Sequence, residues 1–320
     1  MANAGKVNIS KKLKSKKTIL SFIVAGSVLY LLATMIDIGK TISIIKSANI
    51  MYLGIALFVY YASIFLRCYR WKYLLENINF KGTLKNISEI WFLSFFVNCL
   101  IPAKLGDIYR GYLMKKNYMI TISRVLGTVV IERLADTVCL IAMLTLSGFM
   151  IFKGMFPPDV FNVIKYGYGI LFIALLLILF LKHQRERIIS LLPVKFENAV
   201  CEFEHGLWKS VPCHSLPVTG ALTFSVWAGE ILRMHFVIYA LGIDIPLPVV
   251  IFVALLSSFL TSVPLTPAGL GVVEFAVAGV LVFLGYGINI SASIAILDRL
   301  INYASLLVAG SIVYWRSELK

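Results

Sequence analysis

The sequence predicts an all-α, polytopic membrane protein with six transmembrane helices and two re-entrant helical hairpins in two inverted-topology repeats. Of the 320 residues, 59% are apolar and 14% are charged, whereas a soluble domain has roughly 25% charged residues. Several apolar runs are long enough to cross a hydrocarbon core roughly 30 Å thick. Two parts of the chain also share one pattern of broken apolar stretches and embedded charges. The composition excludes a soluble enzyme.

The positive charges of the chain lie in short clusters between the apolar runs. The 30 Lys and Arg against 16 Asp and Glu give a net charge of +14. A nucleic-acid-binding protein would gather these cations on one solvated face or tail, so no nucleic acid is expected as a partner. The five cysteines are widely spaced and match no disulfide framework or metal-binding pattern, and neither a metal nor a cofactor is expected.

Six apolar runs predict membrane-spanning helices. The first, at 18–37, follows a basic segment at 1–17. This run is too long for the apolar part of a signal peptide, and no small-residue cleavage site ends it. It is therefore predicted to be a transmembrane helix. The other five predicted spans lie at 49–69, 125–152, 162–182, 216–241 and 292–315.

Two further apolar stretches, 88–115 and 247–286, are interrupted by proline and glycine near their middle. Each half of these stretches is too short to cross a membrane. Non-helical backbone at that depth must be shielded by protein or line a wet cavity. Both stretches are therefore predicted to form re-entrant hairpins. The predicted hinge residues are Pro102, Gly106, Pro264, Pro267, Gly269 and Gly271.

The distribution of lysine and arginine predicts the orientation in the membrane. If the N-terminus is cytoplasmic, 23 of the 30 cations lie in cytoplasmic segments and only three in external connections. Both termini are therefore expected in the cytoplasm. Because both flanks of 88–115 are basic, the first hairpin is predicted to enter from the cytoplasm. The second hairpin, whose flanks lack cations, is predicted to enter from outside.

The segment at 183–213 is the only long polar stretch between the apolar runs. Its apolar residues recur at helical spacing, which predicts an amphipathic helix at the cytoplasmic interface. We interpret it as a structural strap, with a partner-binding helix as the alternative. The residues of the apolar face are Phe196, Val200, Phe203 and Leu207. The predicted organisation is a basic N-terminus at 1–17, a first repeat at 18–152, a connecting helix at 153–182, the amphipathic segment at 183–213 and a second repeat at 216–316.

Four short matches relate the two repeats at offsets of 164 to 166 residues. Because the two hairpins are predicted to open to opposite sides, the repeats are predicted to be inverted. Inverted repeats with discontinuous helices are typical of alternating-access transporters. The matches are Leu66-Arg67 with Leu232-Arg233, Ser94-Phe95 with Ser258-Phe259, Pro102-Ala103-Lys104-Leu105-Gly106 with Pro267-Ala268-Gly269-Leu270-Gly271, and Glu132-Arg133-Leu134 with Asp298-Arg299-Leu300.

Charged residues within or beside the apolar stretches are the candidates for substrate binding, because a charge in lipid is costly unless it faces a cavity or a partner. Two interpretations stay open for Arg133 and Arg299: contact with the substrate path, or structural ion pairs with hairpin acids such as Asp107 and Glu274. The candidates are Arg67, Lys104, Asp107, Arg110, Glu132, Arg133, Asp136, Glu230, Arg233, Glu274, Asp298 and Arg299.

Phosphate is the ligand that the first hairpin favours. The helix predicted to start at Leu105 would direct free N–H groups and a positive dipole towards an anion. Arginine binds phosphate as a fork, so Arg110 with Arg67 or Arg133 is a candidate headgroup clamp. For Arg67 and Arg70 by themselves, beside Trp71, interfacial anchoring is the favoured interpretation.

The motifs resemble those of the lysylphosphatidylglycerol synthase transmembrane region, or flippase-like domain family. They are F-L-R-x-x-R-W at 65–71, I-P-A-K-L-G-D-I-Y-R at 101–110, S-R-V-L-G-T-V-V-I-E-R-L-A-D at 123–136 and P-L-T-P-A-G-L-G-V-V-E at 264–274. The resemblance implies a lipid-flipping module in a prokaryotic plasma membrane. Its expected partner is a phospholipid or a polyprenyl-phosphate-linked glycolipid. In bacterial relatives this module precedes an aminoacyltransferase; because the present sequence ends at Lys320, synthesis of an aminoacyl lipid is not expected.

Three classes of function are compatible with a charged path through a helical membrane protein. The expected function is lipid translocation by alternating access, and the alternative is secondary transport of a small soluble solute. A membrane-embedded enzyme is not expected, because the sequence carries no H-E-x-x-H, nucleotide-binding or Asp-rich diphosphate motif. A homo-oligomer is left open.

Overall fold

The computed structural model describes residues 16–101, 104–154, 158–184, 193–262 and 266–320, and all regular structure in these ranges is helical. Six helical stretches in these ranges are long and apolar enough to cross a membrane, which confirms the six predicted spans. They are α2 (Lys16–Met35), α4 (Ile50–Asn77), α7 (Ile122–Ile151), α8 (Pro158–His183), α11 (Leu216–Ala240) and the joined stretch of α14 (Ile288–Arg299), η3 (Leu300–Ala304) and α15 (Ser305–Arg316).

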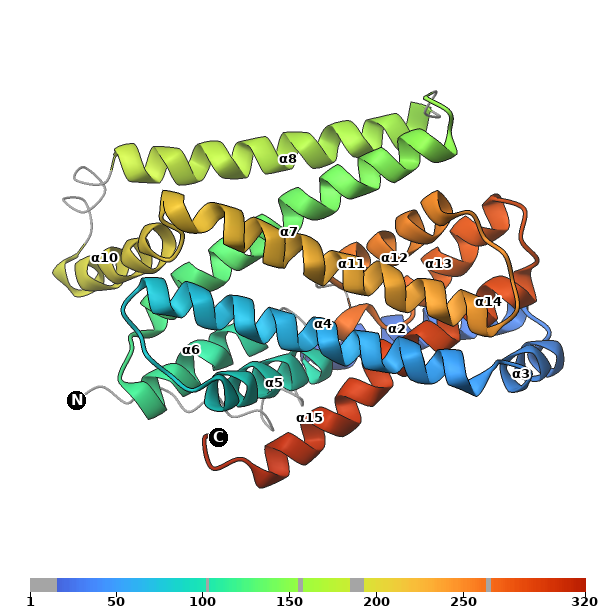
Figure 1. Cartoon of the computed structure of the whole chain (residues 1–320), viewed down its shortest axis with the longest axis horizontal. Coiled ribbons are helices and arrows are strands. Elements are labelled where there is room, and N and C mark those ends of the chain that lie inside the picture. The colour runs from blue at the N-terminus through green and yellow to red at the C-terminus, as the bar shows by residue number, and fades with distance from the viewer. Residues whose placement is uncertain (1–15, 102–103, 155–157, 185–192, 263–265) are drawn as a thin grey trace.

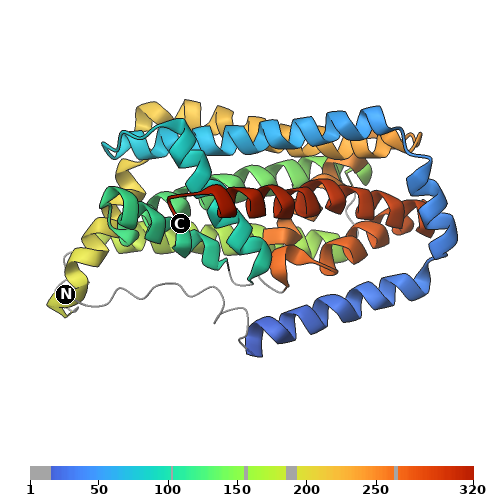
Figure 2. The same ribbon diagram turned by 90° about the horizontal axis from the view of Figure 1, so that it is seen from below.

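Helices α4 and α11 lie side by side and antiparallel on one face of the molecule (Figures 1 and 2). At one end, the backbone N–H of Asn49 donates to the carbonyl oxygen of Ala240 at 2.7 Å. At the other end, the side-chain amide of Asn77 donates to the carbonyl oxygen of Ser210, also at 2.7 Å. α4 is longer than its predicted span, because the buried residues Leu74 and Leu75 extend its packing. This pair joins the half of the chain at 18–152, the first half, to the half at 216–316, the second half.

Each half also contains two short helices separated by a break. In the first half, α5 (Leu84–Leu100) packs against α6 (Leu105–Tyr118). In the second, α12 (Leu247–Ser262) packs against α13 (Val272–Phe283), with the 3₁₀ turn η2 (Pro267–Gly269) between them. All four helices have 17 residues or fewer, fewer than the roughly 20 that cross a membrane. The predicted hinge residues Pro102 and Pro264 lie outside the described residues.

Two of the predicted hinge glycines allow close backbone approach at the breaks. A Cβ atom on Gly106 would lie 1.9 Å from the carbonyl oxygen of Ser94 on α5. A Cβ atom on Gly271, which has a φ of +83°, would lie 2.6 Å from the carbonyl oxygen of Ala25 on α2. Gly269, with a φ of +74°, has the left-handed backbone that glycine adopts without steric cost. These glycines therefore bring the ends of the broken helices against their neighbours.

We expect Gly106→Ala to destabilise the protein by about 1–3 kcal/mol, because the new methyl group would overlap backbone that cannot move aside easily. Thermal unfolding of the detergent-purified protein measures this loss. The matched control is Gly279→Ala on α13, where an added Cβ has no atom within 4 Å. Equal melting temperatures for the two variants would contradict the close approach at Gly106.

The amphipathic segment forms α10 (Val194–Lys209), which packs on the first turns of α7. A Cβ atom on Gly206 would lie 1.9 Å from the carbonyl oxygen of Arg124. The guanidinium of Arg124 donates two hydrogen bonds of 2.7 Å to Glu202, and these bonds hold the pKa of Glu202 below its usual range. Of the predicted apolar face, Leu207 is buried but Phe196 is exposed. This close packing supports the interpretation as a strap.

Two peripheral helices complete the fold. α3 (Ile38–Lys46), in a stretch predicted to be a simple connection, is capped by Asp37 and packs on α14. α8 lies at the edge of the molecule, where it contacts α7 (Figure 1). No residue of α8 between positions 164 and 181 is buried. We therefore expect this helix to be surrounded by lipid.

Candidate functional site

A cavity of about 230 Å³ lies between the two halves of the chain. Residues of α4, α5 and α7 from the first half line it together with residues of α11, α12 and α14 from the second half. Both breaks contribute as well, through Lys104 in the first half and Thr266 and Ala268 in the second. Seven charged residues line the cavity: Arg67, Lys104, Arg133, Asp136, Glu230, Arg233 and Arg299.

On the first-half side, a buried ion-pair network surrounds Glu132 on α7. Arg70 on α4 donates to Glu132 at 3.3 Å and to both carboxylate oxygens of Asp136, at 2.6 and 3.0 Å. Arg110 on α6 donates to the other oxygen of Glu132 at 2.9 Å, and its guanidinium lies 4.5 Å from the centre of the Trp71 ring. Arg70 and Arg110 have no exposed surface. This network fixes α4, α6 and α7 to one another.

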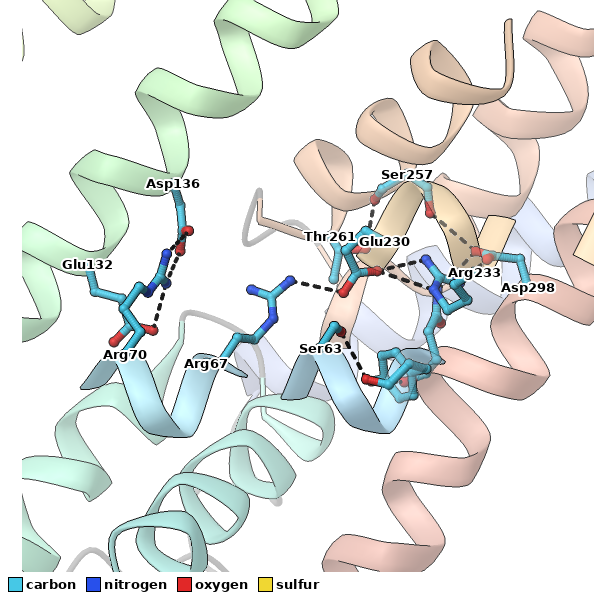
Figure 3. Close-up of polar contacts among 12 residues, drawn as sticks. Ser63, Arg67, Arg70, Glu132, Asp136, Glu230, Arg233, Ser257, Thr261 and Asp298 are labelled. Atoms are coloured by element: carbon cyan, nitrogen blue, oxygen red, sulfur yellow. Dashed lines mark hydrogen bonds and ion pairs between the residues drawn. The ribbon is translucent and has the colours of Figure 1, made fainter. Parts of the chain in front are cut away.

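On the second-half side, Glu230 on α11 is shared by two arginines (Figure 3). Arg67 on α4 donates to it at 2.9 Å, and Arg233, one turn further along α11, donates to it at 2.9 and 3.2 Å. Arg233 also pairs with Asp298 on α14, which accepts a further hydrogen bond of 2.9 Å from Asn302. The contact between Arg67 and Glu230 therefore links the two halves directly.

A second type of ion pair occurs in both halves at matching places. Arg133 on α7 contacts Asp107 at 3.2 Å, and Arg299 on α14 contacts Glu274 at 3.0 Å. Asp107 and Glu274 are each the third residue of the helix that follows a break. Glu274 also accepts a hydrogen bond of 2.7 Å from the backbone N–H of Gly271. The carboxylates thus connect the broken helices to the arginines of α7 and α14.

The structure separates the twelve predicted site residues into two groups. The seven named above line the cavity, and the other five lie behind them and hold the lining arginines or their neighbours. Arg133 and Arg299 form ion pairs with hairpin carboxylates, as the structural interpretation predicted. Both arginines also line the cavity, as contact with a substrate requires. The five supporting residues are Asp107, Arg110, Glu132, Glu274 and Asp298.

Two sequence-based interpretations are changed by this geometry. Arg110 lies behind the cavity, so it forms no clamp there with Arg67 or Arg133. The interpretation of Arg67 and Arg70 as interfacial anchors is wrong, because Arg67 lines the cavity and pairs with Glu230, and Arg70 is fully buried among protein atoms. The i, i+3 spacing of Arg67 and Arg70 on α4 points them to different partners, Glu230 and Asp136 (Figure 3).

Several neutral polar residues of the site were not predicted. Asn98 on α5 accepts a hydrogen bond of 2.7 Å from the backbone N–H of Gly106 and donates to Asp107 at 3.3 Å. Asn302 lies in the π-helical segment directly after Arg299. Its place at i+4 from Asp298 was a signal in the sequence, since residues at this spacing are neighbours on a helix. The two tryptophans of the cavity, Trp91 and Trp227, gave no such signal.

Apolar helices of membrane-spanning length around a charged central cavity define a polytopic membrane protein with an internal polar site. The family model described as the lysylphosphatidylglycerol synthase TM region matches residues 18–310. The chain belongs to this family of flippase-like membrane proteins.

Relatives in archaea share most of the chain. A UPF0104 membrane protein of Methanocaldococcus jannaschii is 39% identical over 70% of this chain and 94% of its own length. A UPF0104 membrane protein of Pyrococcus horikoshii is 22% identical over 94% of this chain and 98% of its own length. The glycosyltransferase AglD of Haloferax volcanii is 23% identical over 90% of this chain, but the matched part is only 53% of AglD. The same membrane module is therefore found alone and within a longer protein.

Proposed function

We propose that the protein is a lipid translocase that moves a polar, phosphate-containing lipid between leaflets by alternating access. The observation that carries this proposal is the charged cavity between the two halves, lined by matching arginines and by both breaks. A headgroup would cross in this cavity while the acyl or prenyl tails stay in the surrounding lipid. The flippase-like character of the family supports the same function.

The mechanism rests on two re-entrant hairpins in repeats of inverted topology. The antiparallel packing of α4 on α11 supports this arrangement, as does the recurrence of the arginine–carboxylate pair behind each break. If the halves exchange conformations, an inward-open cavity becomes an outward-open one. The shared carboxylate of Glu230 lies at the junction of the halves, so its contact with Arg67 would change as the halves move.

The alternative is secondary transport of a small soluble solute, which a cavity of this size would also hold. Native mass spectrometry of the detergent-purified protein distinguishes the two functions. A co-purifying two-tailed lipid with a phosphate headgroup supports translocation, and a bound water-soluble ion supports solute transport. In either case we propose that the protein transports its substrate without catalysing a reaction. We place it in the plasma membrane of a prokaryote. Homo-oligomer formation is left open.

Cysteine accessibility tests the proposed inverted topology. In a Cys213→Ser background, we expect a membrane-impermeant thiol reagent to label Lys115→Cys, on the loop side of α6, from the cytoplasmic side only. The reagent should label Asp244→Cys, in the connection between α11 and α12, from the outside only. Both native side chains are exposed. Labelling of both positions from the same side would contradict inverted repeats.

A further inference from the structure

Lys104 has a backbone conformation that a lysine rarely adopts. Its φ and ψ of 51° and 37° are left-handed, a region in which a side chain crowds the backbone. In the sequence match between the two breaks, the same place is occupied by Gly269, whose φ is +74°. Glycine has this conformation without steric cost. Backbone strain of this kind persists where the surrounding structure holds it, often at functional sites.

Lys104 is also the surplus charge of the site. Within the described ranges, each of the six arginines of the two networks and the two matched ion pairs contacts at least one of six carboxylates. Lys104 lines the cavity, and its ammonium makes no hydrogen bond or ion pair in that part of the chain. The networks are therefore neutral by themselves, and the cavity has one unbalanced positive charge. An isolated charge of this kind in a membrane protein favours an anionic partner.

Residues that line the cavity also carry hydrogen-bond donors without acceptors. Trp91 and Trp227 are 2% and 4% exposed, and neither indole N–H has a partner among the described residues. The Nε atom of Arg133 and the hydroxyl of Thr266 also have no hydrogen-bond partner among the described residues. All four residues line the cavity. Indole and guanidinium N–H groups can only donate, and a buried donor without an acceptor is costly.

We propose that the cavity selects anionic phosphate headgroups that carry no amine, with Lys104 as the residue that determines this preference. Phosphate oxygens would accept from the ammonium of Lys104, from the indole N–H groups of Trp91 and Trp227, and from Arg133. An ammonium on the headgroup would find no free carboxylate, because Asp136 and Glu230 are already bound by arginines. The cavity volume of about 230 Å³ leaves room for a phosphate with water, since one water occupies about 30 Å³.

The inference that the phosphate belongs to a lipid rests on the proposed function. The inference that the cavity prefers an anion rests on the cavity alone. The chemistry differs from that of a lysylated phosphatidylglycerol, whose headgroup carries amines. The test therefore compares phosphatidic acid, phosphatidylcholine and lysyl-phosphatidylglycerol as lipid probes, with inorganic phosphate as the soluble probe. Binding of each probe to the full-length protein in detergent is measured by native mass spectrometry and by thermal shift.

The informative variant is Lys104→Gly, because the matching position of the second break is occupied by glycine, Gly269. It removes the cation and relieves the left-handed backbone, so the protein should melt at an equal or higher temperature. We expect it to lose at least about tenfold in affinity for phosphatidic acid, the loss of one charge-assisted hydrogen bond, with no loss for phosphatidylcholine. The control, Lys115→Ala, removes an exposed lysine of α6 and should bind as the parent protein does. Trp227→Phe should weaken phosphatidic acid binding by a smaller factor.

Preference of the parent protein for lysyl-phosphatidylglycerol, or unchanged phosphatidic acid affinity in Lys104→Gly, would overturn the proposal. Binding of inorganic phosphate as tight as that of phosphatidic acid, and lost in Lys104→Gly, would support the anion site but assign it to a soluble ligand. If vesicle assays show translocation without any headgroup preference, the preference is wrong and the translocase stands. If phosphatidic acid binds through Lys104 but is not translocated, the site stands and the translocase is wrong.

Discussion

Replacing Glu132 with Gln is expected to destabilise the protein by about 3–5 kcal/mol, the usual result of removing one partner from a buried ion pair. One carboxylate oxygen of Glu132 accepts from Arg70 and the other from Arg110. Arg70 would keep its contact with Asp136. Arg110 would lose its only ion pair in the described part of the chain, while remaining fully buried.

The control for this prediction is Glu76→Gln, which removes the partner of Lys72 in an exposed pair and should cost about 0–1 kcal/mol. The double variant Glu132→Gln with Arg110→Met should be more stable than Glu132→Gln alone, because it no longer contains the unpaired guanidinium. Thermal unfolding in detergent measures all three. If Glu132→Gln melted as the parent protein does, the network would not stabilise the packing of α4, α6 and α7.

Arg133→Lys is expected to reduce translocation of an anionic lipid by about tenfold or more, because lysine keeps the charge but loses the guanidinium fork. The melting temperature should change little, since a lysine can still pair with Asp107. The neutral double variant Arg133→Met with Asp107→Asn removes both members of the pair and should fold. It should not recover translocation if Arg133 contacts the headgroup.

Recovered translocation in this double variant would show that Arg133 has a structural role only, as a partner for Asp107. The second half contains the matched pair, Arg299 and Glu274. We expect Arg299→Lys to reduce translocation as Arg133→Lys does, because both arginines line the same cavity. A defect in only one of them would indicate that the two halves contribute unequally.

Much of the fold could be predicted because the bilayer restricts what a sequence can do. Apolar runs of sufficient length predicted all six candidate spans, and proline and glycine at 101–106 and 263–271 predicted the interruptions between short helices. Helix ends were less predictable. α4 continues to Asn77 because Leu74 and Leu75 are buried against protein, and hydropathy cannot distinguish that burial from contact with lipid. α3 was missed because its nine residues are too few to give a clear periodic signal.

The site was predictable where a charge lay within an apolar run or where the repeat marked it. The pairing of Arg133 with Asp107 and of Arg299 with Glu274, one of the two interpretations, is present in the structure. Arg70 was misjudged because its neighbours in sequence resemble an interfacial belt, while its partners, Glu132 and Asp136, lie more than 60 positions away. The left-handed backbone of Lys104 was not predicted, since it depends on the packing of the break and the match with Gly269 was its one signal in the sequence.

The most direct test of lipid translocation through the cavity uses an acyl-labelled fluorescent phosphatidic acid in proteoliposomes. Dithionite is added to destroy the fluorophore in the outer leaflet. With the parent protein, dithionite should destroy nearly all the fluorescence, because inner-leaflet lipid keeps reaching the outer leaflet. Thr137 on α7 lines the cavity. Thr137→Trp should fill part of the cavity and block translocation, so the inner-leaflet signal should stay intact. Val138→Trp, on the exposed side of the same turn, should behave as the parent does. Loss of fluorescence no greater with the parent protein than in protein-free vesicles would contradict translocation through this cavity.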